Sequence, residues 1–188
     1  SVDTVAALLT RRYKKLDEFN AAQIAKFAGG NARLALALAE RVDADETLVS
    51  FTDEQLFQRL FSQRKGESAD LLRGATVLSL VYSFNTTRAE YGDELGVLAA
   101  ISEMPRNALQ RDQAELLRRH LAQQRGKWRA VLPQALATRL ARRALAEYEA
   151  EDINTYLFKP ENIRLFQSCA HRLGYLHDDQ RARALALS

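Results

Sequence analysis

Glycine and proline are scarce in this chain, and their scarcity limits the folds that are open to it. The 188 residues include eight glycines and three prolines, which is too few for the many tight turns of a β-sandwich. Hydrophobic residues make up 47% of the chain and charged residues 27%, the balance of a folded globular protein. We therefore expect a mainly α-helical protein with one domain or two small ones.

Apolar residues recur at helical spacing along most of the sequence. Asn31 is placed to cap one of these helices, and Thr52 to Gln55 has the sequence of a capping box. Spacing and caps predict helices over 2–9, 16–27, 31–42, a stretch from 52, 69–84, 93–102, 107–120, 134–145 and parts of 162–188.

One short β-hairpin is predicted between two of these helices. Residues 121–124 and 127–132 form two extended runs, and Arg125-Gly126 supplies the turn because glycine tolerates a positive φ. Pro133 ends the second run, and the helix over 134–145 follows. Three helices, a hairpin and a further helix are the outline of a winged-helix domain, in which 107–120 would be the recognition helix.

Positive charge is concentrated in one block of the sequence. Residues 106–143 hold ten basic and two acidic side chains, whereas 1–105 and 144–188 both carry a net negative charge. Such a block needs a counter-charge, and nucleic acid, nucleotide phosphate or an acidic protein surface would supply it. The alternative is a solvated helix face on which arginine serves solubility.

Few residues point to catalysis, metal binding or membrane association. Cys169 is the single cysteine, which excludes an internal disulfide and a multi-cysteine zinc site and fits a reducing cytoplasm. No apolar run approaches the ~18–20 residues that span a bilayer. The histidines are isolated and the sequence has no phosphate-binding P-loop. We expect no catalytic residue and no metal site here.

The stretch from Gly29 to Arg33 is the one motif with a recognisable ligand chemistry. Glycines before a helix let the backbone approach a ligand, and the first-turn amides of that helix attract an anion. The guanidinium of Arg33 would add charge and a forked set of donors for a phosphate. The alternative is a helix–helix elbow that carries a surface arginine.

Gly-Asn-Ala-Arg-Leu-Ala-Leu, followed by a winged-helix outline, resembles the lid of P-loop ATPases of the AAA+ and STAND groups. Gly29, Gly30 and Asn31 match the STAND form of this stretch, in which a proline stands where this chain has Ala32. Arg33 instead matches the arginine that AAA+ proteins call sensor 2. The resemblance covers about residues 16–145 and implies that this arginine contacts nucleotide.

A second part of the resemblance lies directly after the hairpin. Pro133 and Gln134 fall where many STAND proteins place a histidine that senses the diphosphate. The resemblance therefore adds both residues to the expected nucleotide-binding set, although Gln134 departs from the histidine of that pattern.

The resemblance also implies an organisation and a function. A four-helix lid would span 1–66, a winged-helix domain 67–150, and the start of a solenoid-like helical region 151–188. The chain would be a non-catalytic piece of a large bacterial STAND ATPase, next to an ATPase core that binds ATP or ADP with Mg²⁺. It would couple nucleotide state to conformational switching and self-association in signalling or anti-phage defence, in the cytoplasm and away from membranes. The isolated piece would hold no nucleotide tightly.

Two other functions stay open at this stage. AAA+ replication initiators also place a winged helix after the lid, and such a domain would bind DNA. The DNA contacts would then come from the recognition helix and the hairpin, through Arg111, Arg118, Arg119, Arg125, Lys127 and Arg129. A structural connector without a ligand is the third possibility, and it predicts little effect from replacing these arginines or Arg33.

Overall fold

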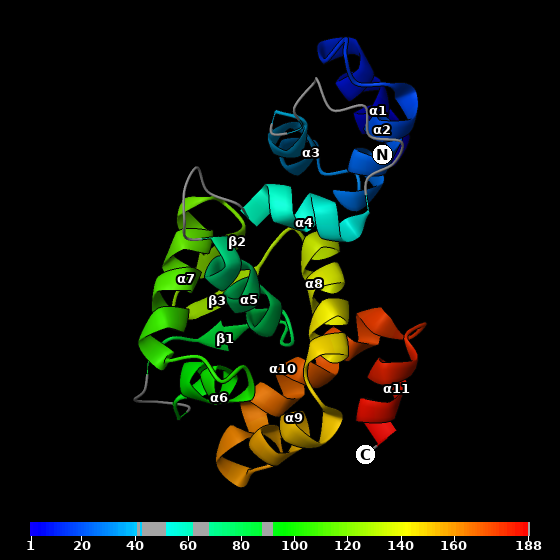
Figure 1. The fold of residues 1–188 in the computed structure, drawn as a ribbon. Coiled ribbons are helices and arrows are strands. Elements are labelled where there is room, and N and C mark those ends of the chain that lie inside the picture. Colours follow the sequence, from blue (N-terminus) through cyan, green and yellow to red (C-terminus); the bar gives the residue numbers. More distant parts are fainter. Residues whose placement is uncertain (41, 43–51, 62–67, 88–91, 188) are drawn as a thin grey trace. The chain divides into compact units, whose positions relative to one another are not determined.

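A computed structural model of the chain describes residues 1–40, 42, 52–61, 68–87 and 92–187. These residues are mainly helical and include a small three-stranded antiparallel sheet, which confirms the expected fold class at that level (Figure 1). The chain divides into two compact units, Ser1–Leu72 and Arg73–Ser188. The division falls inside one helix. The predicted boundary at 66–67 lies outside the described residues.

The first unit has a helical core. Leu9, Ile24 and Leu38 are fully buried, and Phe27 meets Phe57 edge-on with ring centroids 5.1 Å apart. Its complete helices are α1 (Val2–Arg12), α2 (Glu18–Phe27), α3 (Ala32–Ala39) and α4 (Asp53–Phe61).

Side-chain caps fix where two of these helices begin. Asn31 Oδ1 accepts a hydrogen bond from the Leu34 amide at 2.9 Å, which confirms the predicted cap of α3. Thr52 Oγ1 accepts from the Gln55 amide at 3.2 Å, and Gln55 Oε1 accepts from the Thr52 amide at 2.9 Å. This reciprocal pair confirms the capping box at the start of α4.

The second unit combines the sheet with the remaining helices. The strands are β1 (Phe84–Asn85), β2 (Ala122–Arg125) and β3 (Trp128–Val131), in the order β1-β3-β2. The helices are α5 (Ser68–Leu78, which enters from the first unit), α6 (Glu94–Ile101), α7 (Arg106–Arg118), α8 (Gln134–Glu147), α9 (Ala150–Leu157), α10 (Ile163–Leu173) and α11 (Gln180–Leu187), with 3₁₀ turns η1 (Pro160–Asn162) and η2 (Gly174–Leu176).

The predicted hairpin is confirmed, but the helix predicted over 69–84 is too long. The turn between β2 and β3 holds Gly126 at φ +57°. α5 ends at Leu78 because the following segment bonds to α10 instead: the Tyr82 amide donates to the Ser168 carbonyl at 3.0 Å, and the Ser83 amide donates to Ser168 Oγ at 2.8 Å. Local apolar spacing carries no sign of this distant partner.

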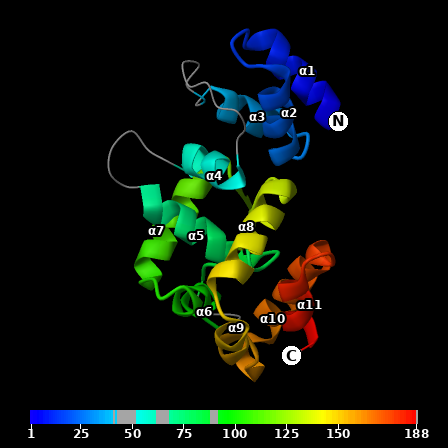
Figure 2. The same cartoon turned by 45° about the vertical axis from the view of Figure 1, so that its right-hand side comes forward.

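The C-terminal helices belong to the same compact unit as the sheet. In both views α9, α10 and α11 lie side by side at the end of this unit (Figures 1 and 2). α9 contacts α6, and α11 contacts α8. These helices therefore lie within the compact unit Arg73–Ser188.

A buried ion pair ties three of these elements together. Glu94 on α6 is 1% exposed and accepts a hydrogen bond from the Asn85 amide of β1 at 2.6 Å. Arg164 of α10 donates to both carboxylate oxygens of Glu94, from Nη2 at 2.6 Å and also from Nε, and from Nη2 to the Ser83 carbonyl at 2.8 Å. The pair joins α6, β1 and α10 where the sheet meets the C-terminal helices.

Candidate functional site

The double glycine forms the bend between α2 and α3. Gly29 and Gly30 adopt φ values of +58° and +75°, which favour glycine. Their amides donate to the carbonyls of Lys26 and Ala25 at 3.1 and 3.0 Å, and the Asn31 amide donates to the Ala28 carbonyl at 3.0 Å. These amides end α2 and are not available to a ligand in this conformation.

Gly30 has a second, structural reason to be glycine. A Cβ atom at this position would lie 3.2 Å from both the Ser1 carbonyl carbon and the Val2 nitrogen. The start of α1 therefore packs directly on the bend.

Arg33 stands one residue inside the start of α3 and is exposed. Among the described residues, its guanidinium forms no hydrogen bond or ion pair, and the backbone amides of Ala32 and Arg33 have no acceptor. No carboxylate in the part of the chain that the structure describes neutralises this arginine. Of the hydrogen-bond donors at the predicted site, the Arg33 guanidinium and the amides of Ala32 and Arg33 therefore remain available to a ligand.

The other predicted nucleotide-binding residues belong to the second unit. Pro133 is the N-cap of α8 and Gln134 is its first residue. Gln134 Nε2 is buried and has no hydrogen-bond partner within the described chain. The predicted set is thus divided between the two units, with Gly29, Gly30, Asn31 and Arg33 in the first.

Much of the positive block is paired inside the second unit. Arg119 Nε lies 2.5 Å from Glu115, which also pairs with Arg118. Other pairs join Arg106 to Asp93 at 2.7 Å, Arg142 to Asp178 at 2.7 Å and Arg143 to Glu147 at 2.6 Å. Several of these carboxylates come from outside 106–143, so the counter-charge predicted for the block is partly internal.

The structure separates the six predicted DNA-contacting residues into two groups. Arg111 and Arg125 are exposed and form no hydrogen bond or ion pair with any described residue. The other four are engaged: Arg118 and Arg119 with Glu115, Lys127 over the Trp128 ring at 5.4 Å, and Arg129 Nη1 with the Gly126 carbonyl at 3.2 Å. Burial lowers the pKa of Arg119 and of Arg129.

Three aromatic side chains gather in a cluster that the sequence analysis missed. Tyr82 stacks on His171 with centroids 4.1 Å apart and planes 10° apart, and Tyr175 lies 6.2 Å from Tyr82 in nearly the same orientation. The spacing of His171 and Tyr175 places them on one face of a helix, but their partner is almost ninety residues away. We call Tyr82, His171 and Tyr175 the ring cluster.

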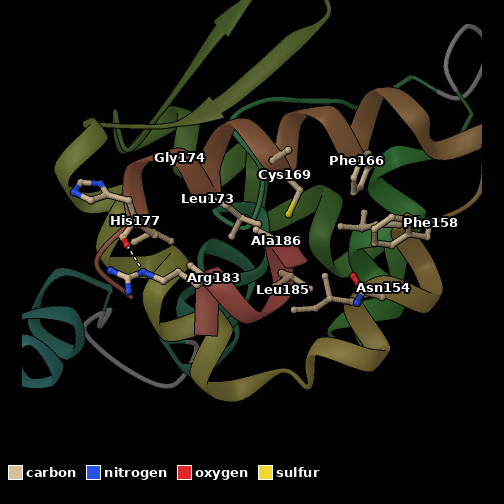
Figure 3. Close-up of a pocket in the computed structure, with 15 residues that line it drawn as sticks. Asn154, Phe158, Phe166, Cys169, Leu173, Gly174, His177, Arg183, Leu185 and Ala186 are labelled. Atoms are coloured by element: carbon tan, nitrogen blue, oxygen red, sulfur yellow. Dashed lines mark hydrogen bonds between the residues drawn. The ribbon is translucent and has the colours of Figure 1, made fainter. Parts of the chain in front are cut away.

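An apolar pocket of about 370 Å³ lies among α9, α10 and α11 (Figure 3). Cys169 lies at its wall, and burial raises the pKa of this thiol to about 12. Arg183 stands at one end, where its Nε donates to the His177 carbonyl at 2.6 Å. A thiol that stays protonated is a poor nucleophile, so Cys169 packs as an apolar residue.

The described residues contain no group of three or more side chains placed to hold a metal ion. Of the helices that the structure describes, none has both the length and the apolar character to cross a membrane. Compared with protein-family models, curated proteins and solved structures, the chain matches none of them.

Proposed function

We propose that the chain is a non-catalytic regulatory module that responds to a nucleotide bound by a neighbouring ATPase domain. The observation that carries this proposal is the state of Arg33: it is exposed, lacks an acidic partner among the described residues, and stands beside two first-turn amides that lack acceptors. Guanidinium and helix N-terminus both favour a phosphate.

The free energy of such a contact is large enough to shift a conformational equilibrium. A hydrogen bond to a charged group contributes about 1.5–3 kcal/mol, and a conformational equilibrium shifts by the difference in affinity between its two states. A phosphate present in ATP and absent in ADP would therefore move the module's equilibrium about tenfold or more. Self-association in signalling or defence would follow from that shift, in the cytoplasm where ATP is available.

The domain assignment forms part of the proposal. The four complete helices of the first unit support a lid-like subdomain. In the second unit, the chain order α5, β1, α6, α7, β2, β3 and the sheet order β1-β3-β2 support a winged-helix domain. α7 then takes the place of the recognition helix and the β2–β3 hairpin that of the wing.

The test uses the natural chain that contains this segment. Arg33→Ala is compared with Arg11→Ala, which removes another exposed arginine from the first unit. We expect Arg33→Ala alone to change ATP hydrolysis and ATP-dependent self-association at least about tenfold. Equal behaviour of the two variants would contradict the proposal, as would a natural chain with no ATP-binding domain of its own or on a stable partner.

A second candidate function is duplex DNA binding. It is favoured by Arg111 and Arg125, which are exposed on the proposed recognition helix and wing without partners in the described chain. The chain is titrated with a labelled duplex at about 50 and 200 mM salt. DNA binding predicts affinity that falls steeply with salt and weakens in Arg111→Ala but not in Arg11→Ala. Absence of salt-sensitive binding would exclude this function.

A further inference from the structure

A cavity of about 440 Å³ lies over one face of the sheet in the second unit. Gln123 and Arg125 of β2 line it together with Trp128 and Ala130 of β3, and the segment at Tyr82 and the start of α8 complete its wall. Because 123 pairs with 130 and 125 with 128 across the hairpin, these four side chains share a face. Neither Arg33 nor any residue of α7 lines this cavity.

The cavity is lined by hydrogen-bond donors that have no acceptor. Gln134 Nε2 is buried without a partner in the described chain. Arg125 is exposed and unpaired there, and the described lining residues include no aspartate or glutamate. Native proteins rarely leave buried donors unpaired. A ligand oxyanion at this position would accept from both side chains.

The ring cluster adjoins this cavity through Tyr82, which belongs to both. Tyr82 is 36% exposed and Tyr175 is 44% exposed, while His171 is exposed between them. Nearly parallel aromatic rings at a surface offer a flat face on which a nucleobase stacks. A cationic, donor-lined cavity next to such rings has the two elements that bind an unpaired nucleotide chain.

We propose that this cavity and the ring cluster form a binding site for single-stranded nucleic acid. Phosphodiester oxygens accept hydrogen bonds from Arg125 and Gln134, and an adjacent base stacks on the exposed ring of Tyr175 in the ring cluster. An acidic peptide would satisfy the donors but leave the rings unused. A duplex keeps its bases stacked on one another, and they cannot reach the rings.

The test measures binding of a fluorescently labelled 12-nucleotide oligothymidine to the chain by anisotropy, at about 50 and 200 mM salt. We expect salt-sensitive binding that Tyr175→Leu weakens about tenfold without changing the salt slope, because stacking releases no counter-ions. Arg125→Gln should weaken binding and reduce the slope by about 0.7, because one phosphate contact is lost. Circular dichroism verifies that each variant is folded.

Two matched controls come from the first unit. Phe19 is 54% exposed and Arg11 is exposed, so Phe19→Leu and Arg11→Gln remove an aromatic ring and a charge elsewhere. The proposal predicts that both bind like the unaltered chain. Absence of binding, equal binding of the matching duplex, equal effects of Phe19→Leu and Tyr175→Leu, or full displacement by 10 mM inorganic phosphate would each overturn it. Displacement by phosphate would mean that the cavity is an anion site only.

Discussion

Arg172 is a buried charged side chain that finds few hydrogen-bond partners in the described structure. It is 1% exposed, its Nη2 reaches the Val81 carbonyl only at 3.5 Å, and its Nε and Nη1 have no partner. The guanidinium carbon lies 5.5 Å from the centre of the Tyr82 ring. Burial lowers the pKa of Arg172 to about 10, and no carboxylate of the described residues offsets that burial.

Arg172→Met should therefore stabilise the chain. Replacing a buried, poorly paired charge by an apolar side chain of similar size is worth ~1–4 kcal/mol in other proteins. Urea unfolding at pH 7 measures the difference. The folded-state pKa lies below the unfolded-state value, so the unfolded chain binds more protons once the pH rises through about 10. The stability of the unaltered chain should thus approach that of the variant as the pH rises through 10. A destabilised variant would contradict this account of Arg172.

Glu94 shows the opposite behaviour at the same scale, because its buried charge is fully paired. Glu94→Ala leaves Arg164 without its carboxylate and the Asn85 amide without its acceptor. We expect a loss of ~3–5 kcal/mol in the free energy of unfolding. The double variant Glu94→Ala/Arg164→Met should recover part of that loss, since no unpaired charge remains. Equal stability of the single and double variants would show that the charge pairing is unimportant.

At the scale of the element, α3 holds a capping residue, Asn31, and a residue that we propose contacts a ligand, Arg33. Asn31 caps the helix, so Asn31→Ala should cost ~1 kcal/mol of stability. Arg33 is exposed without described partners, so Arg33→Ala should change stability by less than about 0.5 kcal/mol. Thermal unfolding followed by circular dichroism compares the two. A large loss for Arg33→Ala would make its role structural and remove the basis for the phosphate contact.

Helix ends and turns were predictable where the residues that fix them are close in sequence, and not where those residues are distant. The caps at Asn31 and Thr52 and the Gly126 turn act within a few residues, and all three are found as expected. The end of α5 depends on Ser168, and the short strand β1 depends on β3, so neither appears in the local pattern. The ring cluster was missed for the same reason.

At the scale of the whole molecule, the second unit should fold without the first. Its buried residues include Leu78, Leu98, Leu109 and Leu140, which come from four different helices. Chains of ~60 residues already fold alone in many cases, and this unit is longer. A fragment of residues 68–188 keeps α5 whole. It should unfold cooperatively in urea with a helical circular dichroism spectrum; a non-cooperative transition would contradict the division into units.

The sequence alone did not predict which charged side chains pair with one another in the folded chain. The block 106–143 is strongly positive, yet Asp93, Glu147 and Asp178 reach it from elsewhere in the chain and pair with its arginines. Fold class follows from composition and spacing because both are summed over many residues. Which cations stay unpaired depends on tertiary contacts, and of the arginines singled out in the sequence only Arg33, Arg111 and Arg125 have no partner among the described residues.

Equilibrium binding of ATP and ADP to the natural chain tests the proposed contact between Arg33 and a nucleotide phosphate. We expect Arg33→Ala to weaken binding of at least one of these nucleotides about tenfold or more, at unchanged stability, while Arg11→Ala binds both like the unaltered chain. The proposed contact would be contradicted if the unaltered chain, Arg33→Ala and Arg11→Ala all bound ATP with one affinity and all bound ADP with one affinity.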